Sequence, residues 1–182
     1  MSTTLTLYPD HAPDQGTRLV DRAEIVAALA DRGIGFERWE AHQTLAANAT
    51  AEDILAAYGQ DIERLKRSRG FTTADVIRMT PEHPDREALR AKFLDEHTHS
   101  EDEVRFFVEG SGLFVLHLGE EVCALHAHAG DLVAVPAGTP HWFDMGPAPR
   151  FTAIRLFTNT EGWVAHFTGD PIAQRFPRLD NA

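Results

Sequence analysis

The sequence predicts a mainly β protein (α+β) with peripheral helices, built around one antiparallel β-barrel or sandwich. Between residues 97 and 158, short apolar or alternating runs are separated by turns that contain glycine, proline or acidic residues. Regular short strands with such turns are typical of antiparallel barrels and sandwiches. Before residue 95, apolar residues recur at helical spacing, which predicts helices packed on the outside of the barrel.

The first part of the chain predicts a strand, a helix and a second strand. Leu5 and Leu7 alternate with threonines, as in a half-buried strand. Asp21 and Glu24 have the spacing of a capping box, which predicts a helix that ends near Gly33. Residues 36–41 follow as the second strand.

Two further helices flank a short strand over residues 75–79. Thr50 is a candidate N-cap, and apolar residues at helical spacing lead from it to Gly70, a candidate C-terminal cap. We therefore expect one continuous helix between them. Pro84 suits the first turn of the next helix, whose apolar residues include Phe93.

The barrel strands are expected after residue 95, where the hydrophobic period changes. Gly110 and Gly112 indicate a turn between the first two strands, and the final residues read as an irregular tail. The expected strands cover residues 104–109, 112–118, 121–128, 131–135, 141–145 and 151–158. A length of 182 residues fits one domain. We expect residues 1–182 to form that domain, with mixed elements over 1–95, the barrel core over 96–158 and the tail over 159–182.

Composition excludes several classes of function. A net charge of −11 should repel phosphate backbones and anionic membrane surfaces, so we expect neither a nucleic acid nor a membrane as partner. The single cysteine, Cys123, excludes an internal disulfide and a cysteine zinc cluster. The N-terminus lacks the basic start and apolar run of a secretory signal, so a cytoplasmic location is expected.

Histidine and glutamate spacing predicts a metal site. His97 and His99 are two residues apart in an expected extended segment, so their imidazoles point the same way. Glu103 opens the next strand after a short turn. A proline- and glycine-containing turn leads to His141, which can supply a third imidazole. Such a set suits Fe²⁺, Ni²⁺, Mn²⁺ or Zn²⁺.

A histidine pair in a strand often only faces solvent. A second pair in this chain can be compared with His97 and His99. His126 and His128 have the same spacing, but neither a glutamate nor a turn that delivers a partner follows them. We interpret them as surface residues. The other histidines lack comparable partners and receive the same interpretation: His11, His42, His83, His117 and His166.

Two motifs resemble those of the cupin superfamily. They are His97-x-His99-x3-Glu103-x6-Gly110 and Gly130-x5-Pro136-x-Gly138-x2-His141. Ala91 and Met145 depart from the general motifs, at positions that do not bind metal in cupins. The resemblance implies a cupin-type antiparallel β-barrel, also described as a double-stranded β-helix or jelly roll, and a metal bound by His97, His99, Glu103 and His141.

A finer resemblance is to the bacterial acireductone dioxygenases of methionine salvage. It rests on Glu96-His-Thr-His-Ser-Glu-Asp-Glu-Val-Arg105, on Pro136-Ala-Gly-Thr-Pro-His-Trp-Phe-Asp-Met-Gly146 and on the tail over 161–170. It implies one Fe²⁺ or Ni²⁺ per chain and cleavage of 1,2-dihydroxy-3-keto-5-methylthiopentene by O2. Iron would give formate and 4-methylthio-2-oxobutanoate. Nickel would give 3-methylthiopropionate, formate and carbon monoxide.

Arg105 lies two residues beyond Glu103, so strand alternation turns both side chains inward. An inward arginine is unfavourable without an anionic partner. The resemblance includes this arginine and implies a catalytic role, in which it stabilises the substrate dianion. On that assignment Arg105→Ala keeps the metal and loses turnover. The alternative is that Arg105 pairs with a buried carboxylate.

Other residues near the motifs have two possible roles each. Phe107 and Phe143 face inward by alternation, and Trp163 would reach the barrel mouth if the tail folds over it. All three are candidates for an apolar substrate pocket, or for plain core packing. Glu96 and Asp102 flank the proposed ligands, either as partners that orient imidazoles or as solvated acids.

Two other classes of function compete with the dioxygenase. Another cupin enzyme, such as a different small-molecule dioxygenase or a sugar isomerase, is the first; several lysines and carboxylates in the pocket would favour the isomerase. A non-enzymatic cupin that binds or stores a small molecule is the second, and a barrel mouth filled by side chains would favour it. We expect a monomer, because the sequence has no heptads and no long apolar edge.

Overall fold

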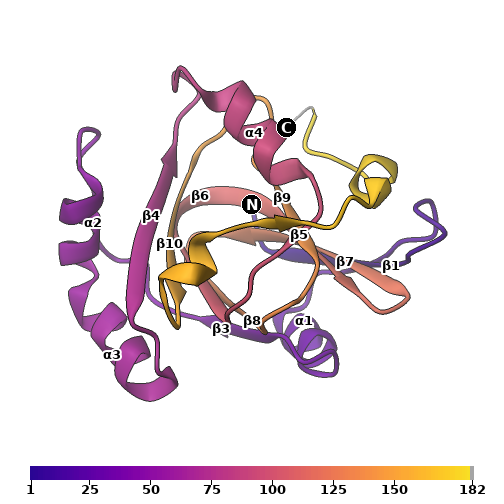
Figure 1. Cartoon of the computed structure of the whole chain (residues 1–182), viewed down its shortest axis with the longest axis horizontal. Helices are drawn as coiled ribbons and strands as arrows, with labels where there is room; N and C mark the ends of the chain where they lie inside the picture. The colour runs from indigo at the N-terminus through magenta and orange to yellow at the C-terminus, as the bar shows by residue number, and fades with distance from the viewer. Residues whose placement is uncertain (181–182) are drawn as a thin grey trace.

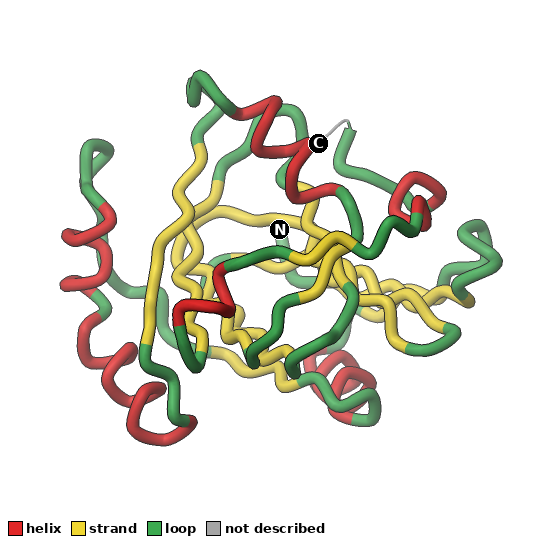
Figure 2. Tube along the Cα trace, viewed as in Figure 1, coloured by secondary structure: helices red, strands yellow, loops and turns green. Residues whose placement is uncertain are grey.

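Antiparallel strands form the centre of the molecule in the computed structural model, which describes residues 1–180, and helices lie around them (Figures 1 and 2). Every strand pair is antiparallel. The predicted fold class, mainly β with peripheral helices, is confirmed. No helix among residues 1–180 is both long and apolar enough to cross a membrane.

Two sheets share one long strand, β6 (Glu103–Leu118). Its first half pairs with β10 (Phe151–Phe157) and β8 (Asp131–Val135), which in turn pair with β4 (Thr73–Met79) and β3 (Gly35–Arg38). Its second half pairs with β7 (Glu121–His128) and β9 (His141–Asp144). Beyond β7 the second sheet continues with β1 (Thr4–Pro9) and β2 (Thr17–Leu19), and beyond β9 with β5 (His97–Thr98) and β11 (His166–Phe167).

The expected turn between residues 109 and 112 is wrong, because β6 runs through it without interruption. Gly110 has a φ of 66°, and a Cβ atom there would lie 1.8 Å from the carbonyl oxygen of Arg150. Glycine therefore lets the strand bend from one sheet into the other at a point where any side chain would clash. The bend brings both sheets around one core.

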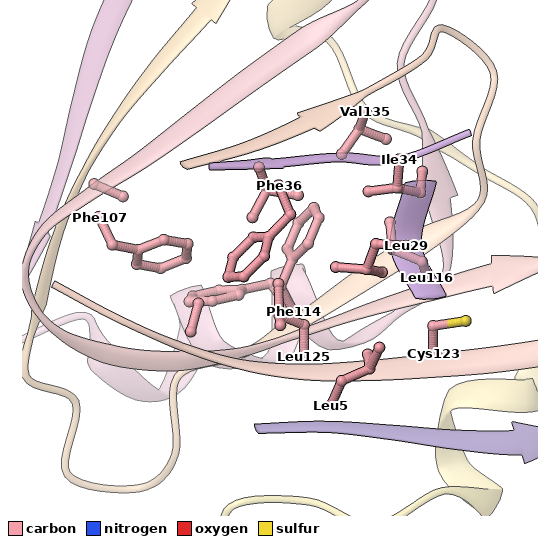
Figure 3. Close-up of a cluster of buried hydrophobic side chains, with 14 of the residues drawn as sticks. Leu5, Leu29, Ile34, Phe36, Phe107, Phe114, Leu116, Cys123, Leu125 and Val135 are labelled. Atoms are coloured by element: carbon pink, nitrogen blue, oxygen red, sulfur yellow. The ribbon is translucent and has the colours of Figure 1, made fainter. Parts of the chain in front are cut away.

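That core lies between the two sheets and is almost wholly apolar. Figure 3 shows Phe107 and Phe114 of β6 pointing into it with Leu5 of β1 and Leu125 of β7. Strand alternation gives β6 two different faces. Glu103, Arg105 and Phe107 point inward, whereas Val104 and Phe106 pack outward against helices.

Within residues 1–180, four α-helices cover the sheets: α1 (Arg22–Ala30), α2 (Ala51–Ala57), α3 (Gly59–Arg69) and α4 (Arg86–Leu94). The expected continuous helix between Thr50 and Gly70 is two helices that break at Tyr58. Tyr58 is buried against Phe106, and its hydroxyl accepts a hydrogen bond from the backbone N–H of Gln43. Glycine at position 59 favours a break. Both helices lie on the outer side of β4 (Figure 1). Apolar residues of both helices pack in one cluster with residues of the sheet.

The tail contains two short 3₁₀ helices, η1 (Thr160–Trp163) and η2 (Pro171–Arg175), with β11 between them. β11 pairs with β5, so the tail forms the edge of the second sheet beside His97. Ile172 and Phe176 then pack on the outer face of this sheet, against Trp142. Residues 181 and 182 of the expected tail lie outside the described residues.

Candidate metal centre

Three imidazoles converge inside the molecule. His97 of β5 and His141 of β9 are register partners, with ring centroids 4.5 Å apart. The ring of His99 lies 5.3 Å from that of His97 and 5.1 Å from that of His141. One ring nitrogen of each histidine lies within 4.8 Å of the other two, and all three residues are buried. The structure therefore brings together the three histidines that sequence spacing singled out.

Backbone carbonyls fix the orientation of all three rings. The Nδ1 atom of His97 lies 2.7 Å from the carbonyl oxygen of Asp95, that of His99 lies 3.0 Å from Val164 O, and that of His141 lies 2.8 Å from Thr139 O. A carbonyl oxygen can only accept, so Nδ1 carries the proton in each ring. The Nε2 atom is left with a free lone pair, which is the form that binds metal.

Glu103 completes the cluster, and Arg105 holds the Glu103 carboxylate by hydrogen bonds. Glu103 Oε2 lies 3.7 Å from His99 Nε2 and 3.9 Å from His141 Nε2. Glu103 Oε1 accepts hydrogen bonds from Arg105 Nε at 3.0 Å and from Nη2 at 2.8 Å. The guanidinium also lies over the rings of Phe114 and Phe143, at 4.7 and 5.2 Å. Arg105 therefore pairs with a buried carboxylate, which is the alternative role that the sequence left open. A direct contact of Arg105 with the substrate stays a prediction.

The electrostatics keep the histidines neutral and the glutamate ionised. Burial is the largest cause that lowers the pKa of His97, to about 4, and that of His141, to about 3. Burial alone would raise the pKa of Glu103, but nearby positive charge, above all that of Arg105, lowers it to about 2. Neutral imidazoles beside a carboxylate are the protonation states that a divalent metal requires.

Acid is expected to destabilise the metal-free protein between about pH 6.5 and pH 4. In that window the unfolded chain protonates His97 and His141, whereas the folded chain does not, so unfolding becomes easier as pH falls. From pH 7 to pH 5 the loss should be roughly 2 kcal/mol for each histidine. Glu103 contributes little there, since its pKa shift, from 4.5 to about 2, acts at lower pH.

Urea unfolding of the metal-free protein at pH 7 and pH 5 measures this loss. The variant His97→Asn/His141→Asn lacks both groups. If its free energy of unfolding falls by as much as that of the wild type, these two histidines are not the cause.

Three buried polar atoms at this place have no hydrogen-bond partner within the described residues: His99 Nε2, Glu103 Oε2 and His141 Nε2. A buried acceptor without a partner is destabilising, so three of them facing one point indicate a missing ligand. Two nitrogen lone pairs and a carboxylate oxygen, with His97 beside them, fit a divalent transition metal.

Contacts around the turn before His141 explain how β9 reaches the site. Asp102 Oδ1 accepts the backbone N–H of Ala137 at 2.8 Å, and the carbonyl oxygen of His99 accepts that of Gly138 at 2.9 Å. Gly138 has a φ of 76°, which glycine adopts without strain. Asp102 thus holds the turn and does not contact an imidazole of the cluster.

Glu96 is buried rather than solvated, and it does not orient the clustered imidazoles. Its Oε2 lies 2.8 Å from His117 Nδ1, and its Oε1 accepts a hydrogen bond from Thr168 at 2.8 Å. The interpretation of His117 as a residue without partners is therefore wrong. His117, Glu96 and Asp170 form a second group with ligating atoms within 4.8 Å of one another. Within that group Glu96 is hydrogen-bonded to His117 of β6, and its second bond, to Thr168, joins the tail to this place.

The second histidine pair, His126 and His128, lies away from the metal centre. His126 and His128 lie on β7 with ring centroids 4.6 Å apart. Among residues 1–180, no third His, Cys, Asp or Glu comes close enough to form a ligand group with them. Both residues are half-buried on β7.

A cavity of about 330 Å³ lies beside His97 and His99. Trp163 lines it, as expected if the tail covers the mouth. Phe107 and Phe143 do not; they pack in the core with ring centroids 6.2 Å apart. The other lining residues come from α4, β10 and the tail: Lys92, Phe93, Arg155, Val164, Ala165 and Phe167.

Sequence reasoning missed Arg155, although a signal for it exists. Arg155 is a charged residue at the inward-facing position of β10, a strand that is otherwise mostly apolar and buried throughout. The same argument from alternation that selected Arg105 would have selected it.

Comparisons with known proteins agree with this geometry. The model of the ARD/ARD' family matches residues 5–165. A protein named acireductone dioxygenase from Pseudomonas paraeruginosa is 56% identical over 180 residues, which cover 98% of this chain and 99% of that protein. One from Parasynechococcus marenigrum is 57% identical over 184 residues, covering 97% and 98%.

Among solved structures, similarity extends to an acireductone dioxygenase from Bacillus anthracis with a cadmium ion in its active centre. The two structures match with a TM-score of 0.80 at 28% identity, over 91% of this chain and 98% of that one. The match shows that the arrangement of strands and helices is shared over nearly the whole length of both chains.

Proposed function

This chain belongs to the ARD/ARD' family, and on that premise we propose that it is a metal-dependent acireductone dioxygenase. The observation that carries the proposal is the cluster of three Nε2 lone pairs and one carboxylate oxygen beside a cavity of about 330 Å³. The substrate is 1,2-dihydroxy-3-keto-5-methylthiopentene, and O2 is the co-substrate. The protein acts as a monomer in the cytoplasm, in methionine salvage.

His97, His99, Glu103 and His141 hold the metal, one Fe²⁺ or Ni²⁺ per chain. A divalent ion bound there would supply a Lewis acid for the adjacent oxygens of an enediol. The protein's own residues prepare that place. Three carbonyl groups fix the imidazole tautomers, and Arg105 fixes Glu103 so that Oε2 faces the histidines.

The cavity favours this function over the two alternatives. A sugar isomerase would need carboxylates along the cavity, but none of the residues that line it is acidic. A barrel mouth filled by side chains would have favoured the non-enzymatic cupin, whereas here about 330 Å³ is open beside the imidazoles. Phe93, Trp163 and Phe167 offer apolar surface for a methylthioether tail.

Metal exchange tests the products. Protein freed of metal and reloaded with Fe²⁺ should convert the acireductone and O2 to formate and 4-methylthio-2-oxobutanoate. The Ni²⁺-loaded protein should release carbon monoxide with formate and 3-methylthiopropionate. Chromatography of the products and a carbon monoxide assay measure both. Identical products with the two metals would refute the metal-dependent choice.

A further inference from the structure

The cavity beside the imidazoles is lined by basic side chains. Its ionisable lining residues are His97, His99, Lys92 and Arg155, with no carboxylate among them. The chain as a whole has a net charge of −11, so a cavity lined only by basic groups runs against its composition. Such a lining favours the binding of an anionic ligand.

Arg155 is the fixed cation of this cavity. It lies on β10 directly opposite Arg105 of β6 in the strand register. Its Nε donates to Asp75 Oδ1 at 3.0 Å and its Nη2 to Oδ2 at 2.5 Å, which holds the guanidinium plane. The residue is 9% exposed. Among residues 1–180, no protein group accepts a hydrogen bond from its Nη1.

Arg105 is less suited to meet a ligand. It is 3% exposed, does not line the cavity, and directs Nε and Nη2 to the same oxygen of Glu103. Phe114 and Phe143 flank its guanidinium. Arg155, by contrast, reaches the cavity and keeps one nitrogen free.

We propose that Arg155, held in place by Asp75, binds the anionic oxygens of the substrate, while Arg105 positions Glu103. The proposal rests on the proposed function, since it concerns the substrate of the same site. Each arginine–carboxylate pair is electrically neutral, so a divalent cation in the cluster leaves the enclosed site positive. A substrate dianion balances that charge, and Arg155 supplies a directed donor at the side of the cavity that faces β10. Lys92, which is exposed, adds charge at the mouth without a fixed direction.

Anion binding can be measured without turnover. The protein loaded with Zn²⁺, which is redox-inert, is titrated calorimetrically with oxalate, a small dianion with adjacent oxygens. Loss of a charge-assisted hydrogen bond should weaken oxalate binding by about 10- to 100-fold in Arg155→Ala. Arg155→Lys should recover part of the affinity, because lysine keeps the charge but lacks the fork that Asp75 holds.

Two variants control for folding. Asp75→Ala/Arg155→Ala removes both partners of the pair, so it leaves no unpaired charge, and it should lose the same affinity. Arg78→Ala is the matched control: Arg78 of β4 forms an ion pair with Glu109 of β6, 3.2 Å apart, and does not line this cavity. It should bind oxalate like the wild type.

The outcomes separate this proposal from the proposed function. Wild-type oxalate affinity in both Arg155 variants, or no oxalate binding by the wild type, overturns the role of Arg155. The Fe²⁺-loaded Arg155→Ala protein should also show a raised KM for the acireductone. If the wild type does not turn over the acireductone but oxalate binding depends on Arg155, the proposed function fails and the anion site stands.

Discussion

Replacing His141 with alanine should abolish specific metal binding. The Nε2 atom of His141 is buried, has no hydrogen-bond partner in the described part of the chain and lies 3.9 Å from Glu103 Oε2, so it supplies one of the converging lone pairs. Loss of an outer-shell partner typically lowers metal affinity by about 10- to 100-fold, and loss of a ligand should exceed that. Metal per chain after dialysis, measured by elemental analysis, tests this.

His126→Ala is the matched control for that experiment. His126 belongs to a pair with the same sequence spacing as His97 and His99, yet it lies on β7 away from the cluster. The control should keep the wild-type metal content. Unchanged metal content in His141→Ala would place the metal elsewhere, and a large loss in His126→Ala would show that the other pair binds it.

Arg105→Ala should weaken metal binding as well as catalysis. The arginine donates both hydrogen bonds that hold Glu103 Oε1, and its charge keeps the pKa of Glu103 low. Without it the carboxylate loses its orientation and takes up protons more easily. We expect metal affinity to fall by about 10- to 100-fold, with a lower melting temperature, because a buried charge is left unpaired. Arg105→Lys should recover part of both.

This expectation differs from the one that the sequence supports, in which the variant keeps its metal. Arg32→Ala controls for the loss of an ion pair, since Arg32 binds Glu121 with two hydrogen bonds at 2.8 and 3.0 Å away from the site. Metal titration and thermal unfolding decide the matter. If Arg105→Ala keeps wild-type metal affinity and loses turnover, Arg105 contacts the substrate directly and does not act through Glu103.

The sequence predicts the cluster well because local spacing determines it. His97 and His99 are two residues apart in extended chain, and Gly138 permits the turn that delivers His141. Strand limits are predicted best where turn residues bound them: residues 121–128 and 131–135 match β7 and β8. In both cases the information lies within a few residues of the chain.

The features that the sequence does not predict depend on contacts between distant segments. Gly110 looks like a turn residue, but it lies at a bend within β6. Only glycine fits there, because the backbone at Arg150 leaves no room for a side chain. The helix after Thr50 breaks where Tyr58 packs on Phe106 of β6. The cavity combines α4, β10 and the tail, so periodicity within any one segment cannot show that Arg155 and Trp163 meet.

The most direct test of the account is the initial rate of O2 consumption with the acireductone as substrate. The metal-free protein should consume O2 no faster than the uncatalysed reaction. Addition of one equivalent of Fe²⁺ should raise the rate, with formate released as O2 is used, in the wild type and in His126→Ala but not in His141→Ala. A rate that stays at the uncatalysed level in the Fe²⁺-loaded wild type would contradict the account.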